Sequence, residues 1–153
     1  MQTTMEVGCK QEASDLLDRY VTCLDERRFD EWLDLFADDA FYSMLLHKDY
    51  VQDTNMLAIG EDKKRLAGRI EVAQGIERDL VTHMLTAVTA EEAKDGGGAV
   101  RASANFAVIR KGAIHCSGRY RLELARTGAG LKIRRCVVVL NNEVINSTIY
   151  LPV

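Results

Sequence analysis

The sequence predicts an α+β fold in which N-terminal helices pack on a strongly curved antiparallel or mixed β-sheet. Apolar residues recur at helical spacing in the first part of the chain, whereas apolar and polar residues alternate at strand spacing in the last third. The helices come first and the strands follow, without the alternation that builds a parallel sheet. We therefore expect a cone-shaped molecule with an apolar hollow.

The strand pattern is clearest in residues 118–153. Apolar and charged side chains alternate over residues 118–124, a glycine-containing turn follows at residues 127–130, and a second strand runs to residue 140. Asn141-Asn142 then breaks the pattern. We expect a final return strand over residues 144–151, ended by Pro152.

One of these strands is apolar on both faces. Val137, Val138, Val139 and Leu140 point alternately to opposite sides, so one pair can fill the cone and the other needs a cover. We expect the outer face to meet another protein surface and to hold a cyclic trimer. Of Val138→Asp and Val139→Asp, one should unfold the domain and the other should give folded monomers.

The N-terminal segments predict three helices. Residues 1–9 are expected to be a loose tail, and a first helix spans about residues 10–26 with one apolar face. A short second helix starts at Asp30, a residue type suited to an N-cap, and Asp38-Asp39 ends it. A third helix spans roughly residues 60–80, with Leu66, Ile70, Ala73 and Leu80 on its apolar face.

The remaining segments predict strands and a connection. A first strand is expected over residues 40–46, and a polar connection follows over residues 47–55. Further strands are expected over residues 81–89, 100–110 and 114–125.

Composition indicates one globular domain over residues 1–153. A hydrophobic content of 47% and a charged content of 28% are ordinary for a soluble protein. The net charge of −3 gives no electrostatic reason to expect nucleic acid or an anionic membrane as partner. No apolar run approaches the roughly 20 residues that span a bilayer. We therefore expect neither nucleic acid nor a membrane as a partner.

The N-terminal residues and the cysteines point to the cytoplasm. Residues 1–10 lack both the positive segment and the apolar segment of a signal peptide. The four cysteines are scattered along the chain, and in that context we expect reduced thiols.

The chain lacks the sequence patterns of metal and cofactor sites. Zinc and Rieske iron–sulfur sites need cysteine and histidine at short spacings, and only His115-Cys116 are adjacent. A non-haem iron triad needs two histidines and a carboxylate, but His47 and His83 lie on separate segments without a supporting motif. We therefore expect no cofactor and no metal in this chain.

One set of residues remains a candidate for catalysis. Asp38, Asp39 and Tyr42 follow the second helix, and His83 begins a later strand, so all four could meet at the mouth of the cone. A histidine and a carboxylate placed there could act as general acid and base. Alternatively, Asp38-Asp39 only terminates a helix and His83 hydrogen-bonds a backbone carbonyl.

Several segments carry a family resemblance. Residues 24–36, with Asp38-Asp39 and Tyr42 after them, resemble the N-terminal signature of the small (beta) subunits of aromatic-ring-hydroxylating dioxygenases. His83-Met84-Leu85, residues 105–110, and residues 118–135 resemble later segments of that family in the same order. Together these segments cover most of the chain.

Two positions depart from the family pattern. Thr82 stands where the family often has arginine, so we do not expect the salt bridge that an arginine could form at that position. The segment 47–59 is short, and in this it is similar to the compact small subunits of oxygenases that act on hydroxybenzoates and phthalate-type acids.

The resemblance implies a nuclear transport factor 2-like, cystatin-like cone and a structural role. The small subunits would form a homotrimer within a hexamer with three large subunits. The Rieske [2Fe–2S] cluster and the mononuclear Fe(II) that hydroxylates the ring would belong to the large subunit, and the complex would serve aromatic compound catabolism. No catalytic residue is then expected in this chain. The alternative is a stand-alone cyclase, dehydratase or isomerase that uses Asp38 or Asp39 with Tyr42 and His83.

Overall fold

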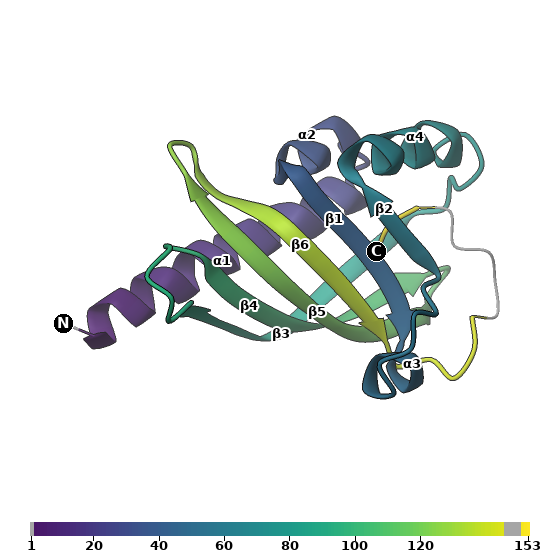
Figure 1. Cartoon of the computed structure of the whole chain (residues 1–153). Helices are drawn as coiled ribbons and strands as arrows, with labels where there is room; N and C mark the ends of the chain where they lie inside the picture. Colours follow the sequence, from purple (N-terminus) through teal and green to yellow (C-terminus); the bar gives the residue numbers. More distant parts are fainter. Residues whose placement is uncertain (1, 146–150) are drawn as a thin grey trace.

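The fold is a six-stranded sheet with its longest helix on one face and shorter helices at both ends (Figure 1). The computed structural model describes residues 2–145 and 151–153. Its elements are α1 (Gln2–Asp25), α2 (Phe29–Asp34), β1 (Phe36–Leu46), α3 (His47–Val51), β2 (Ile59–Asp62), α4 (Lys63–Ala73), β3 (Val81–Glu92), β4 (Val100–Arg110), β5 (Ala113–Thr127) and β6 (Gly130–Leu140). The α+β class with helices packed on a mixed sheet is confirmed.

The sheet order is β2-β1-β6-β5-β4-β3. Only the central β1–β6 pair is parallel, and the other neighbours are antiparallel. The long helix α1 runs along one face, while α2 and α4 lie together at one end of the sheet (Figure 1). We call the face toward α1 the inner face and the opposite face the outer face.

Aromatic side chains fill the space between α1 and the inner face. Tyr20 of α1 lies 5.3 Å, centroid to centroid, from both Trp32 and Tyr120, in edge-on arrangements. Trp32 also lies 4.7 Å from Phe36, and Tyr42 completes the cluster. All five rings are almost completely buried. Such pairs contribute about 0.5–1.5 kcal/mol each beyond the area they bury, so they fix α1 and α2 against the sheet.

The expected loose tail is helical from Gln2 onward. Cys9 and Ala13 are buried on the same side of α1, four residues apart, so this part of the helix packs against the molecule. This contact is hard to predict from the sequence because the apolar stripe becomes sparse before Leu16.

The prediction that Asp38-Asp39 ends the second helix is wrong. Helix α2 already ends at Asp34, and both aspartates lie in β1. Phe36 pairs with Ile133 and Phe41 with Arg135, so β1 has extra residues between these two pairs and bulges there. The bulge places the two carboxylates in solvent, which gives a strand a polar segment that resembles a helix end.

The third predicted helix is shorter than expected. Asp62 caps α4, because its side chain accepts a hydrogen bond from the backbone N–H of Arg65 at 2.8 Å. The residues before it form β2, and the helix ends at Ala73, two residues before Gly75. Leu80 lies beyond the helix and is 82% exposed, so it does not belong to the predicted apolar face.

Two further expectations need correction. The connection over residues 47–55 contains the short helix α3. Of the return strand expected over residues 144–151, Val144, Ile145 and Leu151 are not in a strand, and the other residues lie outside the part described. The strands β3, β4, β5 and β6 match the predicted segments to within a few residues.

The doubly apolar run in β6 is covered more fully than expected. Val138 faces the inner core and is completely buried. On the outer face Val139 is also buried, next to Leu45 of β1 and Arg119 of β5, whereas Val137 remains half-buried. Helix α3, which packs against β1 and β6, covers this end of the outer face. Val137 is therefore the apolar residue of the run that is open to a partner.

Candidate functional site

The hollow between α1 and the sheet contains one histidine–carboxylate pair. His83 is an inward-facing residue of β3, and Asp25 lies in the last turn of α1. The Nδ1 atom of His83 lies 2.6 Å from an Asp25 carboxylate oxygen, and the backbone N–H of His83 donates to the same carboxylate at 3.0 Å. One carboxylate thus joins the end of α1 to the start of β3.

This geometry determines what His83 can do chemically. A carboxylate beside Nδ1 favours a proton on that nitrogen and orients the ring, which leaves Nε2 as the free acceptor. The His83 side chain is only 1% exposed, and its Nε2 has no hydrogen-bond partner among the described residues. An oriented imidazole with a free nitrogen is the arrangement of a general base.

Two tyrosines meet at one oxygen atom deeper in the hollow. The hydroxyl groups of Tyr20 and Tyr42 donate to the main-chain oxygen of Val153 at 2.9 and 3.2 Å. The main-chain N–H of Val153 in turn donates to the Tyr42 oxygen at 3.3 Å. Burial raises the pKa of both tyrosines well above the usual value, and the nearby Cys136 raises it further. Both tyrosines therefore stay protonated and act as donors.

Two other polar groups in the core lack partners among the described residues. The hydroxyl of Tyr120 and the indole N–H of Trp32 are buried and make no hydrogen bond there. The Tyr120 ring stacks on Phe106 at 4.3 Å, so packing holds it in place without the hydroxyl. A buried polar group without a partner costs about 1–3 kcal/mol, so the core has unused capacity for hydrogen bonding.

The open space at the mouth of the hollow is small. A cavity of about 40 Å³ lies between His83, Phe29, Val108 and Val153. This is room for a few water molecules at most. At its rim Arg110 forms an ion pair with Asp79 at 2.7 Å and lowers the pKa of that carboxyl. In the described state the hollow is closed to a substrate.

The structure does not bring together all the predicted catalytic residues. Tyr42 and His83 both lie near Val153: Tyr42 donates to its main-chain oxygen, and His83 lines the small cavity that Val153 also lines. Asp38 and Asp39 lie outside it: Asp38 is fully exposed near Lys63 at 3.7 Å, and Asp39 pairs with Arg134 at 3.0 Å. The partner of His83 is the Asp25 carboxylate, and not the backbone carbonyl of the alternative interpretation.

Asp25 is the residue that the sequence analysis missed. It follows Leu17 and Val21 at four-residue intervals, so it continues the buried stripe of α1. A carboxylate at a stripe position needs a partner inside the molecule. That spacing was the available signal.

Metal-binding groups do not gather in the described residues. No three or more histidine, cysteine, aspartate or glutamate side chains there lie close enough to hold a metal ion. The four cysteines are free and buried. Burial raises the pKa of Cys116 to about 11 and that of Cys136 to about 12, so both stay thiols at neutral pH.

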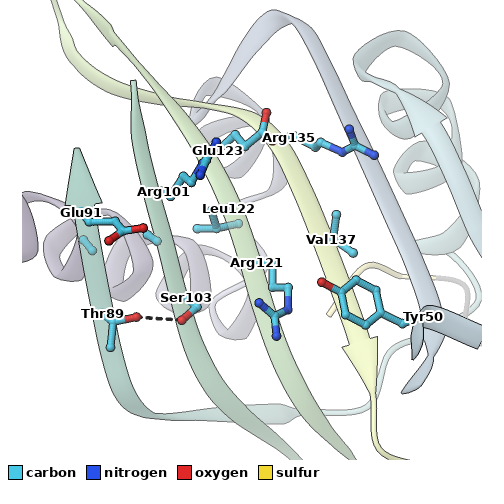
Figure 2. Close-up of a pocket in the computed structure, with 12 residues that line it drawn as sticks. Tyr50, Thr89, Glu91, Arg101, Ser103, Arg121, Leu122, Glu123, Arg135 and Val137 are labelled. Carbon is cyan, nitrogen blue, oxygen red and sulfur yellow. Dashed lines mark hydrogen bonds between the residues drawn. The ribbon is translucent and has the colours of Figure 1, made fainter. Parts of the chain in front are cut away.

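The outer face carries a row of alternating charges across four strands. In the register of the sheet, Glu91 lies opposite Arg101, Arg101 lies opposite Glu123, and Glu123 lies opposite Arg135. Opposite charges therefore alternate from β3 to β6. None of these four side chains forms an ion pair within the described residues, although their neighbours have opposite charge. We call this set the charge row (Figure 2).

A shallow groove follows the charge row. It has a volume of about 610 Å³ and is lined by the charge row, by Tyr50, Arg121 and Val137, and by the hydrogen-bonded hydroxyls of Thr89 and Ser103 (Figure 2). The Arg121 guanidinium lies 5.2 Å from the centre of the Tyr50 ring, a cation–π distance. The outer face therefore offers fixed charges around an apolar centre at Val137.

Within residues 2–145 and 151–153, no helix is long and apolar enough to cross a membrane.

Comparison with known proteins identifies a family for this sequence and solved structures with a similar fold. The family model described as "Ring hydroxylating beta subunit" matches residues 19–147. A search of curated proteins gave no match. Among solved structures, the chain is similar to the beta subunit of a candidate aromatic-ring-hydroxylating dioxygenase from Novosphingobium aromaticivorans DSM 12444. The TM-score is 0.79 and the identity 21%, with 91% of this chain and 92% of that chain covered.

Two further structures support the same fold. The beta subunit of the benzoate 1,2-dioxygenase from Burkholderia mallei ATCC 23344 has a TM-score of 0.69 and 23% identity, with 90% of this chain and 93% of that chain covered. A nuclear transport factor 2-like protein with a cystatin-like fold from Novosphingobium aromaticivorans has a TM-score of 0.69 and 19% identity, with 90% and 85% covered. Because the family model matches most of the sequence, the chain belongs to the ring-hydroxylating beta subunit family.

Proposed function

We propose that this chain is the small structural subunit of a multicomponent Rieske non-haem iron aromatic-ring-hydroxylating oxygenase. It would form a homotrimer within a hexamer with three large subunits, support the catalytic large subunit, and act in the cytoplasm in aromatic compound catabolism. The Rieske [2Fe–2S] cluster and the mononuclear Fe(II) would be in the large subunit. The match of residues 19–147 to the beta subunit family carries this proposal.

The hollow supports a structural role for the residues that could otherwise be catalytic. Asp25 accepts hydrogen bonds from both the ring and the backbone of His83, so it anchors α1 to β3. The cavity of about 40 Å³ beside this pair is too small for an aromatic substrate. A stand-alone cyclase, dehydratase or isomerase would need a larger hollow and would have to use Asp25 where the sequence suggested Asp38 or Asp39.

The outer face supports assembly. Charges that are solvated and unpaired in one chain can pair across an interface, where complementary potentials favour the correct partner. The charge row surrounds the half-buried Val137, so a partner on this face would bury an apolar centre within a polar rim. We infer that the subunits associate with one another through this groove.

The test is co-expression with a candidate large subunit, followed by mass measurement in solution and an assay of oxygenase activity. The wild-type chain should co-purify as a hexamer and should be required for full activity. Val137→Asp should leave the circular dichroism spectrum unchanged and shift the complex to smaller species. Val72→Asp is the matched control, since Val72 is 66% exposed on α4 and lies away from the groove.

A wild-type chain that stays monomeric at micromolar concentration, alone and with the large subunit, would overturn the proposal. Equal assembly by Val137→Asp and the wild type would remove the groove from the interface and leave the rest of the proposal standing.

A further inference from the structure

The charge row has a sign pattern that is complementary to its own reverse. Glu91, Arg101, Glu123 and Arg135 lie on consecutive strands from β3 to β6, so the signs run negative, positive, negative, positive (Figure 2). All four side chains are exposed, and none has an ion-pair partner among the described residues. Reversing the direction of the row exchanges all four signs, so two copies of the row that run in opposite directions attract each other.

Rotational symmetry determines which charges of two copies can meet. The copies in a closed ring are related by rotation alone, without a shift along the axis. If the row lay along the axis, each side chain would face the same residue of the next copy, and like charges would meet. If the row lies across the axis, the β6 end of one copy meets the β3 end of the next, and opposite charges meet.

We propose that the charge row crosses the axis of the homotrimer and binds the charge row of the next copy, with Arg135 against Glu91 and Glu123 against Arg101. This inference rests on the proposed association of the subunits through the outer groove, and it adds the orientation and the residue pairs. The partner of the row is a second copy of this chain rather than the large subunit.

The other polar side chains beside the row are already engaged within the chain. The hydroxyls of Thr89 and Ser103 lie 2.8 Å apart in a hydrogen bond, and the Arg121 guanidinium lies 5.2 Å from the centre of the Tyr50 ring. Val137, two residues after Arg135 on β6, adds a half-buried apolar surface on the same side. The four charges of the row therefore remain for a partner, and complementary potentials across an interface fix its orientation.

Glu91 and Arg135 are the best residues for a test because they lie at opposite ends of the row. Three strand spacings separate them, roughly 14 Å at about 4.8 Å each, which exceeds the Debye length of about 8 Å at physiological salt. A coupling between these two residues must therefore arise between copies. Arg101 and Glu123 lie opposite each other within one chain, so variants there would combine both kinds of contact.

The experiment uses the full chain co-expressed with a candidate large subunit. Mass measurement during dilution gives the concentration at which half of the complex dissociates. Glu91→Arg and Arg135→Glu each bring like charges together and should raise this concentration about tenfold. Independent effects would multiply to about a hundredfold. The double variant Glu91→Arg/Arg135→Glu restores opposite charges and should instead return to within about threefold of the wild type.

Two further variants serve as controls. Glu71→Lys reverses an exposed charge on α4, away from the groove, and should leave dissociation unchanged. Glu91→Gln/Arg135→Gln removes both charges without introducing repulsion, so it should weaken association about threefold and reduce its dependence on NaCl between about 0.05 and 0.5 M. Circular dichroism checks that each variant is folded, as expected for substitutions at exposed positions.

A double variant that dissociates as readily as the single variants would assign the row to the large subunit and overturn the inference. Single variants that dissociate like the wild type would overturn it as well. In both cases the wild type still forms the hexamer, so the proposed function stands. A wild type that does not assemble overturns the proposed function and this inference together.

Discussion

On the inner face of the sheet, several buried polar groups have partners within the chain. On the outer face, the four charged side chains of the charge row have no ion-pair partner among the described residues. Tyr20, Tyr42 and His83 are tied to Val153 or Asp25 inside the hollow. On the outer face, the charge row alternates sign from β3 to β6, and its four side chains form no ion pair with one another or with any other described residue. Strand β3 carries a residue of each set, His83 and Glu91, so one strand of the sheet presents both environments.

The difference follows from solvation. Inside, a polar group has lost water and needs a protein partner, which fixes neighbouring elements to each other. Outside, water satisfies the charges, and exposed ion pairs add at most about 1 kcal/mol. The inner face therefore determines the stability of the chain, while the outer face remains available to a second molecule.

The largest expected effect is a difference in the free energy of unfolding between variants at two adjacent residues of β6, one on each face of the sheet. Val138→Asp places a carboxylate in the completely buried core and should cost more than about 4 kcal/mol, enough to unfold a domain of this size. Val137→Asp, on the half-buried outer side, should change the free energy of unfolding by less than about 1 kcal/mol. Urea titration followed by circular dichroism measures both. Similar losses for the two variants would contradict the assignment of faces.

The next effect concerns the close contact of β5 and β6. A methyl group on Gly118 would lie 1.9 Å from the Val139 carbonyl oxygen, so one strand would have to move. Gly118→Ala should therefore destabilise the chain by about 3 kcal/mol. Gly128→Ala is the control, because a methyl group there meets nothing within 4 Å. Thermal midpoints of the two variants should differ by several degrees, and equal midpoints would count against this packing.

A smaller effect is expected at the Asp25–His83 pair. Asp25→Asn replaces the carboxylate that accepts from the backbone N–H and faces Nδ1 of His83, so it should cost about 2 kcal/mol. Asp38→Asn, at the fully exposed carboxylate, should leave stability unchanged within about 0.5 kcal/mol. Chemical denaturation compares them. A silent Asp25→Asn would mean that the pair does not anchor α1.

The smallest effect has opposite signs at two tyrosines of one cluster. Tyr120→Phe removes a hydroxyl without a partner and should stabilise the chain by up to about 1 kcal/mol. Tyr20→Phe removes the hydroxyl that donates to Val153 and should destabilise it by about 1 kcal/mol. Differential scanning calorimetry resolves shifts of this size. A destabilised Tyr120→Phe would indicate that its hydroxyl has a partner, such as a bound water.

The sheet was the most predictable part of the fold. In β4 and β5 every buried residue alternates with a more exposed one, so the period of two identifies both the strands and their faces. The segment from β1 to α4 was less predictable, because the bulge at Asp38-Asp39 and the short strand β2 interrupt the periodic pattern. Register and bulges depend on pairing with distant strands, which local sequence does not specify.

The candidate site was predictable only in part. Tyr42 and His83 were expected at the mouth of the hollow because Tyr42 follows the second helix and His83 begins a later strand, and the structure buries both side chains inside the molecule. Asp25 was not predicted, although it is a carboxylate that continues the buried stripe of α1. The contact of Val153 with Tyr20 and Tyr42 joins residues far apart in the sequence, and no spacing rule predicts it.

The parallel pairing of β1 with β6 has a consequence for how the chain folds during synthesis. Tyr42 pairs with Cys136 and Leu46 with Leu140, so β1 has no neighbour on that side until residues 136–140 have been made. Contacts between such distant residues slow folding, and an unpaired central strand can pair with other chains in the meantime. For this reason we expect the side of β1 that later pairs with β6 to be prone to aggregation during translation.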